Sequence, residues 1–422
     1  MKNNFEEITI LIKNKKFSEA INCLNNLSED EKKETNFVFL LGISYLFLGD
    51  FNQAINNFNT AIKMNRNNSS FYFYRGYAFS KLSKLDQTEE DYIKAISLKP
   101  MSAELYNNLA GINYIAGENE KSIQNYLKSI ELNKNLKKSL LGLAHVLSQT
   151  KTTNMNSSEI IKTHNEIKEI EFNYSPEKYI DDIQIRELLG KTNLIVEKYI
   201  NNLELDISQT YREQKVAPKC GRHKKIFKYE GIIPKHCFSC YKIQIEVSNV
   251  LELIKLFIIF DKIKLPDGNY RKCMIELRPG VKGNYKGLIF CESIQEAELI
   301  LQDLELILQN NLKKKLICKI KRGCSEYYDK YPDYNRLDNK ALKYNSDWQN
   351  YEKKFDEKNS DLIFDKKPSP TLEGLSLYDA LVFRNWLAFA KLIGDESHKI
   401  ISDKFYYSKY IEDKMKAKQK NY

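Results

Sequence analysis

The sequence predicts a multidomain chain, in which an all-α solenoid is followed by a zinc-stabilised α+β domain and a helical C-terminal extension. Three observations support this. Small and aromatic residues recur with a period of 34 within residues 1–149. Cysteine and histidine residues stand in two closely spaced pairs between residues 220 and 240. Beyond residue 240 the apolar pattern changes from helical spacing to the alternation of strands.

The repeat is clearest in two successive copies. The first carries, in order, Gly42, Tyr45, Gly49, Ala54, Phe58 and Ala61. The second carries Gly76, Phe79, Ser83, Thr88, Tyr92 and Ala95 at the same spacing. This order of small and aromatic positions resembles the tetratricopeptide repeat, a pair of helices that stacks on its neighbours into a solenoid. We therefore expect residues 1–149 to be such a solenoid.

The resemblance implies that a protein partner binds in the concave groove, which the first helix of each repeat lines. Transferred to this sequence, the groove positions are Phe39, Ile43, Phe73, Tyr77, Asn107, Tyr114 and His145. Residues 150–215 are expected to be a linker and connecting helices. A polar linker at 150–158 would precede helices over 159–172 and 176–211.

The paired cysteines and histidine predict a structural zinc site. Cys220 and His223 form one pair with two residues between them, and Cys237 and Cys240 form the other. Such spacing lets two donors in a tight turn face one ion while the second pair completes a tetrahedron. His236 is the alternative fourth ligand. Because the protein fills all four positions, such a Zn²⁺ would stabilise the fold and leave no place for a catalytic water.

Residues 216–330 also predict a small sheet. Strands are expected at 241–247, 272–278, 285–291 and 316–321, and helices at 249–262 and 294–309. This β-α-β-β-α-β order is the ferredoxin-like arrangement, whose helices cover only one face of the sheet. Alternation places the apolar side chains under the helices and a largely cationic set on the open face.

Within the third strand, the run Lys286-Gly287-Leu288-Ile289-Phe290 resembles the corresponding motif of RNA-recognition modules. Leu288 and Gln244 depart from that pattern, since they stand where stacking aromatic residues are usual. The nucleic-acid-binding residues expected on the open face are Lys242, Lys272, Arg278, Lys286, Phe290, Lys319 and Lys321.

The distribution of charge agrees with an anionic ligand. The formal net charge is +10, and residues 211–330 alone contribute +10 by Lys and Arg against Asp and Glu. A concentrated basic segment is typical of surfaces that meet phosphate. A solvated lysine-rich surface is the alternative. Among the other cysteines, Cys273, Cys291 and Cys318 are expected inside strands. Cys324 is expected to be the most reactive thiol, because Lys321 and Arg322 stand beside it.

Residues 331–422 are expected to form a helical extension with a basic tail. Its clearest helix spans 376–393, with Trp386, Leu387 and Phe389 packed on the α+β domain. The start of the chain lacks a signal-peptide pattern, and the most apolar run, from Leu251, is too short to cross a bilayer. These features indicate a cytoplasmic protein that does not enter a membrane.

Together these patterns favour an adaptor that is not an enzyme. The solenoid would bind a protein partner, and the basic domain would bind a phosphate-bearing ligand such as RNA. One alternative is a transferase-like enzyme that the solenoid brings to its substrate, although the sequence has no phosphate-binding glycine loop of the P-loop or dinucleotide type. The other is an assembly factor that binds only proteins.

Overall fold

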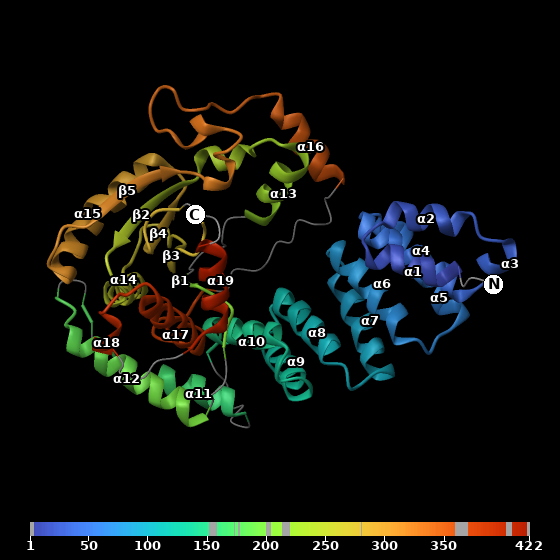
Figure 1. The fold of residues 1–422 in the computed structure, drawn as a ribbon, viewed down its shortest axis with the longest axis horizontal. Coiled ribbons are helices and arrows are strands. Elements are labelled where there is room, and N and C mark those ends of the chain that lie inside the picture. The colour runs from blue at the N-terminus through green and yellow to red at the C-terminus, as the bar shows by residue number, and fades with distance from the viewer. Residues whose placement is uncertain are drawn as a thin grey trace. The chain divides into compact units, whose positions relative to one another are not determined.

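The computed structural model describes residues 4–151, 158–172, 174–175, 178–199, 204–212, 220–279, 281–358, 370–401 and 407–419. The chain divides into two compact units. The N-terminal unit is built from residues 1–143 with 357–367, and the C-terminal unit from residues 144–356 with 368–422. Figure 1 labels the elements of both.

The N-terminal unit is a succession of helix pairs. Its helices are α1 (Asn4–Lys13), α2 (Phe17–Asn25), α3 (Glu29–Lys32), α4 (Thr35–Leu48), α5 (Phe51–Met64), α6 (Ser69–Lys81), α7 (Leu85–Leu98), α8 (Ala103–Ala116) and α9 (Asn119–Leu132), followed by α10 (Lys137–Gln149). α4 packs on α5, α6 on α7 and α8 on α9. These pairs follow the period that the sequence predicts.

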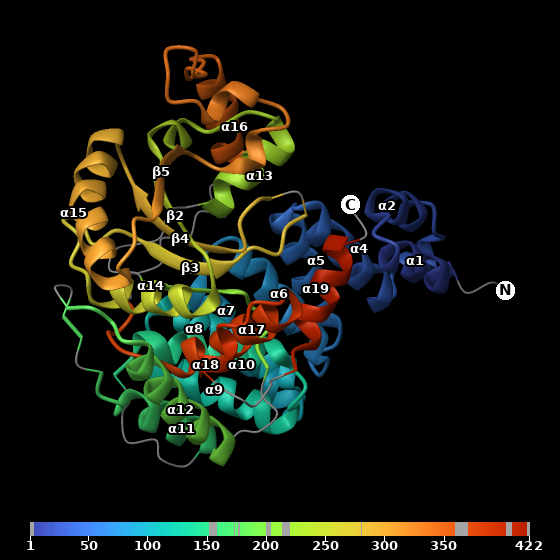
Figure 2. The same ribbon diagram turned by 60° about the vertical axis from the view of Figure 1, so that its left-hand side comes forward.

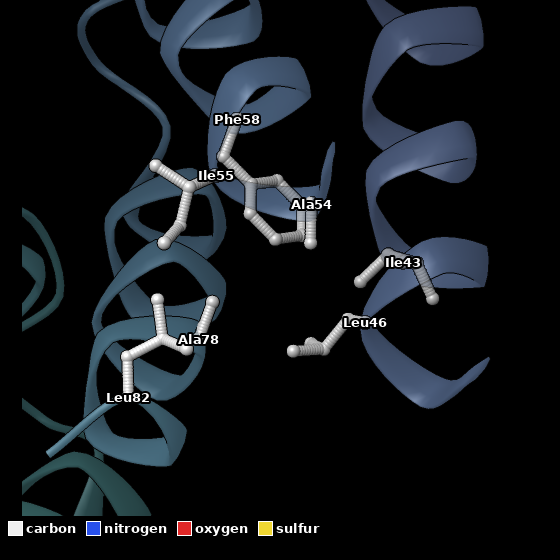
Figure 3. Packing of buried hydrophobic residues seen from close by; sticks show 7 residues of the cluster. All are labelled: Ile43, Leu46, Ala54, Ile55, Phe58, Ala78 and Leu82. Carbon is white, nitrogen blue, oxygen red and sulfur yellow. The ribbon is translucent and has the colours of Figure 1, made fainter. Parts of the chain in front are cut away.

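The small and aromatic repeat positions meet between these helices. Figure 3 shows one cluster of buried side chains that draws on α4, α5 and α6: Ile43, Leu46, Ala54, Ile55, Phe58, Ala78 and Leu82. A Cβ at Gly42 would come 2.7 Å from the Phe58 ring. Glycine at that position therefore lets the paired helices approach each other, and the aromatic ring fills the remaining space.

The C-terminal unit contains a five-stranded antiparallel sheet in the order β1-β3-β4-β2-β5. The strands are β1 (Gln209–Arg212), β2 (Tyr241–Val247), β3 (Arg271–Ile275), β4 (Tyr285–Cys291) and β5 (Ile317–Arg322). α14 (Val250–Lys262) and α15 (Ile294–Leu312) pack on one face of it (Figures 1 and 2). From β2 onward, the order of strands and helices is the one expected from the sequence.

The edge strand β1 corrects one expectation. The sequence predicted a helix through residue 211, but α12 (Asp182–Tyr199) ends earlier and Gln209–Arg212 pairs with β3. The short run Gln-Thr-Tyr-Arg alternates between half-buried and buried side chains. Its strand conformation depends on hydrogen bonds with a distant segment, which local spacing does not reveal.

A C-terminal helix, α17 (Leu377–Leu392), lies in the core of the C-terminal unit, as the sequence predicted for this helix. The Trp386 side chain is fully buried, and its indole N–H donates to the Ser208 carbonyl at 2.9 Å. The Phe389 ring packs edge-on against Tyr285 of β4. The Asn385 side chain donates to the carbonyls of Leu205 and Ile207 at 2.6 and 2.7 Å. The last part of the chain thus secures the segment that leads into β1.

The other elements of this unit are short or peripheral. They are α11 (Glu159–Lys168), α13 (Cys220–Glu230), η1 (Lys235–Ser239), η2 (Ser325–Tyr327), η3 (Pro332–Asn335), α16 (Trp348–Lys358), α18 (His398–Ile401) and α19 (Lys409–Gln419). Among the described residues, no helix combines the length and the apolar character needed to cross a membrane.

Candidate functional site

The face of the sheet opposite α14 and α15 forms the floor of a cleft with a volume of about 1110 Å³. Every second residue of β2, β3, β4 and β5 points to this face. Ten Lys and Arg side chains line the cleft, against three Glu side chains. The basic residues are Lys224, Lys242, Lys272, Arg278, Lys282, Lys286, Lys319, Lys321, Lys414 and Lys418. We call this feature the cationic cleft.

The structure brings together all seven residues that the sequence placed on the open face, since each lines the cationic cleft. It also adds residues that the sequence reasoning missed. Lys224 comes from α13, and Lys414 and Lys418 come from α19. The basic composition of the C-terminal tail was visible in the sequence, but its place beside the sheet depends on tertiary packing.

Several cations in the cleft have no carboxylate to neutralise them. Within the described residues, Lys242, Lys272, Lys319 and Lys321 form no ion pair. The Lys272 ammonium group donates to Gln209 Oε1 at 3.0 Å. Burial, together with the positive charges of Lys242 and Arg278, lowers the pKa of Lys272 to about 8. Burial and neighbouring lysines also lower the pKa of Lys321. A bound anion would reduce the repulsion between these neighbouring positive charges.

A buried carboxylate organises one end of the cleft. Glu276 is fully buried, and its Oε2 accepts from Arg278 at 2.7 Å and from Lys286 at 3.1 Å. Burial alone would raise the pKa of Glu276, but hydrogen bonds and charge from Arg278 and Lys286 outweigh it and lower that pKa to about 2. Glu276 is therefore a buried anchor for two cations of the cleft.

The run from Lys286 to Phe290 lies in β4, the strand expected for it. Lys286, Leu288 and Phe290 line the cleft, while Gly287 faces α14, where a Cβ would approach Leu256 at 2.5 Å. The Lys242 ammonium group lies 5.1 Å from the centroid of the Phe290 ring. Phe290, the aromatic residue retained from the motif, therefore already has a cation over one face of its ring.

Next to the cleft, a small cavity gathers sulfur and imidazole groups. Its lining includes all four predicted zinc ligands and two further donors: Cys220, His223, His236, Cys237, Cys240 and Cys324. We call it the thiol cavity. The local backbone differs from the pair of turns expected, because Cys220 and His223 occupy the first turn of α13. Cys237 lies in η1, and Cys240 directly precedes β2.

The chemistry of these donors fits zinc, which binds thiolate and imidazole groups. In the described part of the chain, however, no three His, Cys, Asp or Glu side chains are already gathered as a formed metal site. Burial raises the pKa of Cys237 to about 12 and that of Cys240 to about 11. Burial lowers the pKa of His223 to about 4, so this imidazole is neutral at physiological pH. The compatibility of this cavity with a metal ion therefore rests on the types of donor atom that line it and on their presence in one cavity.

Six of the predicted groove positions of the solenoid are half-buried aromatic or polar side chains. The prediction was wrong for Ile43, because this side chain is buried in the core cluster between α4, α5 and α6. Phe73 stacks on Tyr77 and on Tyr92, and the Lys81 ammonium group lies over the Tyr77 ring at 4.6 Å. Asn107 Oδ1 accepts a hydrogen bond from Ser139 at 3.0 Å. His145 belongs to the C-terminal unit, where its ring bonds to the Tyr211 hydroxyl at 3.1 Å.

Several solved structures resemble this chain at low overall similarity. MamA from Desulfovibrio magneticus RS-1 (residues 41 to the end) is 19% identical, with a TM-score of 0.32, over 35% of this chain and 85% of its own. MamA from AMB-1 is 16% identical, with a TM-score of 0.31, over 35% and 80%. The first TPR of Spaghetti (RPAP3), bound to the HSP90 peptide SRMEEVD, is 18% identical, with a TM-score of 0.27, over 27% and 91%.

Sequence comparison with known families reaches only the N-terminal unit. No curated protein matches the chain at a significant level. A family model described as TPR repeat matches residues 42–83, and one described as tetratricopeptide repeat matches residues 103–136. The first match overlaps both copies of the 34-residue period described above, and the second covers the helix pair α8 and α9. The part of the N-terminal unit between residues 42 and 136 therefore contains tetratricopeptide repeats.

Proposed function

We propose that this protein is an adaptor whose cationic cleft binds a phosphate-bearing ligand, single-stranded RNA being the form we favour, while its repeats bind a protein partner. The tetratricopeptide repeats support the protein-interaction part of this role. The observation that carries the ligand part is the excess of cations on one face of the sheet, where ten basic side chains meet three carboxylates.

The lysines without carboxylate partners favour phosphate over a neutral ligand. Lys242 stands on β2, Lys319 and Lys321 stand on the adjacent β5, and Lys272 stands on β3, which β4 separates from β2. Lys242 and Lys321 pair directly in the ladder between β2 and β5. An anion that spans them would relieve their mutual repulsion and release its own counterions. An ordinary protein surface has charges of both signs interspersed, so it does not concentrate positive charge in this way.

The size and the aromatic lining of the cleft favour a chain of several nucleotides. Its volume of about 1110 Å³ exceeds the roughly 300–1,000 Å³ of a small-molecule pocket. Tyr270, Phe290, Tyr328 and Tyr410 also line it. Aromatic rings set among cations are the usual means of holding single strands without strict sequence preference. The β-α-β-β-α-β order of the sheet supports the ferredoxin-like interpretation, which RNA-recognition modules share.

The test is the affinity of the full chain for a fluorescent single-stranded RNA oligonucleotide over a range of salt concentrations. Four phosphate contacts would give a slope of log affinity against log salt of about −3. Replacing Lys319 and Lys321 by Gln should reduce the magnitude of that slope by roughly 0.7 for each lysine. The matched control replaces Lys225 and Lys315, which lie outside the cleft, and should leave it unchanged. Binding that ignores salt would remove RNA from the proposal.

The protein-binding part has a separate test. Crosslinking of the full chain to proteins in a nuclease-treated lysate should identify a partner whose recovery falls when Tyr77 and Asn107 are replaced by Ala. Replacement of Met101, which is 76% exposed outside the helices, is the control. Equal recovery with all variants would place the partner elsewhere on the chain.

We also propose that the thiol cavity holds one structural Zn²⁺, with ligands drawn from the side chains that line it. Such an ion would supply folding energy and no chemistry, because protein ligands would fill its coordination sphere. The cysteines and histidines come from α13, from η1 and the residue after it, and from the turn after β5. The ion would therefore join two neighbouring segments of the chain to a turn that is distant in the sequence. Elemental analysis of the purified chain should find zinc, and a chelator should lower its melting temperature.

A further inference from the structure

The thiol cavity holds more donors than a tetrahedral ion needs. We infer that its metal ligands are the four thiols of Cys220, Cys237, Cys240 and Cys324, and that the imidazoles of His223 and His236 lie outside the coordination sphere. This inference rests on the proposed zinc site and specifies its ligands. It replaces His223, which sequence spacing favoured, with Cys324, which stands 84 positions beyond Cys240 in the sequence.

Strand pairing brings Cys324 to the other thiols. β2 and β5 are antiparallel neighbours, and Tyr241 pairs with Arg322 at the end of their ladder. One step further, the Gly323 N–H donates to the Cys240 carbonyl at 2.7 Å. Cys240 and Cys324 therefore flank the same end of the ladder. Their proximity follows from the register of the sheet, and so it does not depend on the conformation of a single side chain.

A glycine and a tyrosine fix the turn that carries Cys324. Gly323 has a φ of +57°, and a Cβ at this position would overlap the Tyr334 hydroxyl. Tyr334 is fully buried, and its hydroxyl donates to the Cys237 carbonyl at 2.6 Å. The same side chain thus packs against the turn before Cys324 and holds the backbone of Cys237. Only a residue without a side chain admits this arrangement.

The packing of the side chains distinguishes the thiols from the imidazoles. Cys220, Cys237, Cys240 and Cys324 line one small cavity, and they already supply the four donors that a tetrahedral ion takes. The His223 and His236 rings pack on each other, with their centroids 5.2 Å apart. Each imidazole therefore has a ring partner of its own.

Four thiolates around a divalent ion carry a net charge of −2, and nearby cations compensate for it. The Lys242 ammonium group lies 3.5 Å from the Cys324 sulfur. The Lys224 side chain lines the thiol cavity together with Cys220 and Cys324. Such outer-sphere donors orient metal-binding thiolates and stabilise their charge. Lys242 and Lys224, which line the cationic cleft, would thus also compensate the negative charge of the thiolates.

The size of the cavity favours a single ion over an iron–sulfur cluster, which four thiolates also hold. Its volume is about 10 Å³, close to that of one water-sized sphere. A multinuclear cluster needs considerably more room. Zn²⁺ is the expected occupant, because tetrahedral sites made only of thiolates select zinc among the common single ions.

X-ray absorption at the zinc edge of the full-length wild-type protein gives the most direct test, since it needs no variant. Four sulfur ligands at about 2.3 Å are expected. Three sulfurs and one nitrogen at about 2.0 Å would overturn the inference while leaving the zinc site in place. If the purified chain contains no zinc and binds none on reconstitution, the zinc proposal itself fails. Bound iron with the absorption of a cluster would also overturn it.

Variants give an independent measurement. Cys324→Ser should lower zinc retention and, in the cobalt-substituted protein, reduce the thiolate-to-metal charge-transfer band by about a quarter, since one of four thiolates is lost. Cys318→Ser, on the neighbouring strand and outside the cavity, is the matched control for loss of a cysteine. His223→Gln should keep both zinc and the band. Loss of metal in His223→Gln with full retention in Cys324→Ser would refute the four-thiol ligand set.

Discussion

The Lys242 ammonium group lies 3.5 Å from the sulfur of Cys324, and these two residues connect the two candidate sites of the C-terminal unit. Lys242 lies in β2 and lines the cationic cleft. Cys324 lines both the cleft and the thiol cavity, as does Cys220. A metal bound to these thiols would therefore fix one wall of the proposed ligand site.

Replacing Lys242 by Met should affect both sites at once. It removes a cation from the cleft and the outer-sphere donor to Cys324, so RNA affinity should fall and zinc affinity should drop by about tenfold or more. Competition with a chromophoric chelator measures the second effect. Lys242→Arg, which keeps the charge, should weaken neither by as much. Unchanged zinc affinity in Lys242→Met would separate the two sites.

Ligand binding should depend on pH through Lys272. Burial and nearby cations lower the pKa of this lysine to about 8, so raising the pH from about 7 to 9 removes its charge. RNA affinity should fall by about tenfold over this range, the loss of one charge-assisted hydrogen bond worth roughly 1.5 kcal/mol. Lys272→Arg keeps its charge throughout and should flatten the profile. Fluorescence anisotropy at constant ionic strength measures both, and identical profiles would contradict the assignment.

Glu276 should contribute strongly to the stability of the C-terminal unit. Glu276→Gln leaves the buried Lys286 without its carboxylate, which should cost about 3–5 kcal/mol in the free energy of unfolding. The folded pKa of Glu276, about 2, lies below the usual value. Its contribution is therefore complete above about pH 4.5 and is lost as the pH falls towards 2. Denaturant titration at several pH values should show that the variant lacks this loss. Asp338→Asn, at the exposed Arg336 pair, should change little.

Two glycines near the same tyrosine should respond in opposite directions. A Cβ at Gly142 would overlap the Tyr126 ring, whereas a Cβ at Gly111 would lie 3.8 Å from its hydroxyl. Gly142→Ala should therefore destabilise the repeats by about 1–3 kcal/mol. Gly111→Ala, in the interior of α8, should stabilise them by roughly 0.5–1 kcal/mol. Thermal unfolding followed by circular dichroism measures both, and similar changes in the two variants would contradict this packing.

Sequence periodicity was sufficient where the structure depends on local spacing. The repeat positions around Gly42 and Phe58 predicted the paired helices, because close helix contacts need small residues at fixed intervals. Strand alternation likewise placed Lys242, Lys272 and Lys319 on one face of the sheet. Both depend on spacings that the backbone geometry imposes on any helix or strand.

The remaining features depend on contacts between distant segments. β1 forms because Gln209–Arg212 meets the free edge of β3, and its four residues carry too short a pattern to distinguish a strand from a helix. Cys324 reaches the other thiols through the register of β2 and β5. Its neighbours Lys321 and Arg322 suggested a reactive thiol, and no local spacing related it to Cys240. Pairing across the sheet, which one sequence does not display, was the missing information.

The position of α17 in the core bears on how the protein is made. Asn385 and Trp386 hold the backbone of residues 205–208, and Asp379 bonds Arg212 at 3.1 Å, so the central sheet acquires its edge support from a helix near the end of the chain. During synthesis the tetratricopeptide repeats, whose contacts are between neighbours, can assemble as they leave the ribosome. The sheet cannot complete its packing until α17 has been synthesised. A chain truncated before residue 377 would therefore have folded repeats joined to an incompletely folded C-terminal unit.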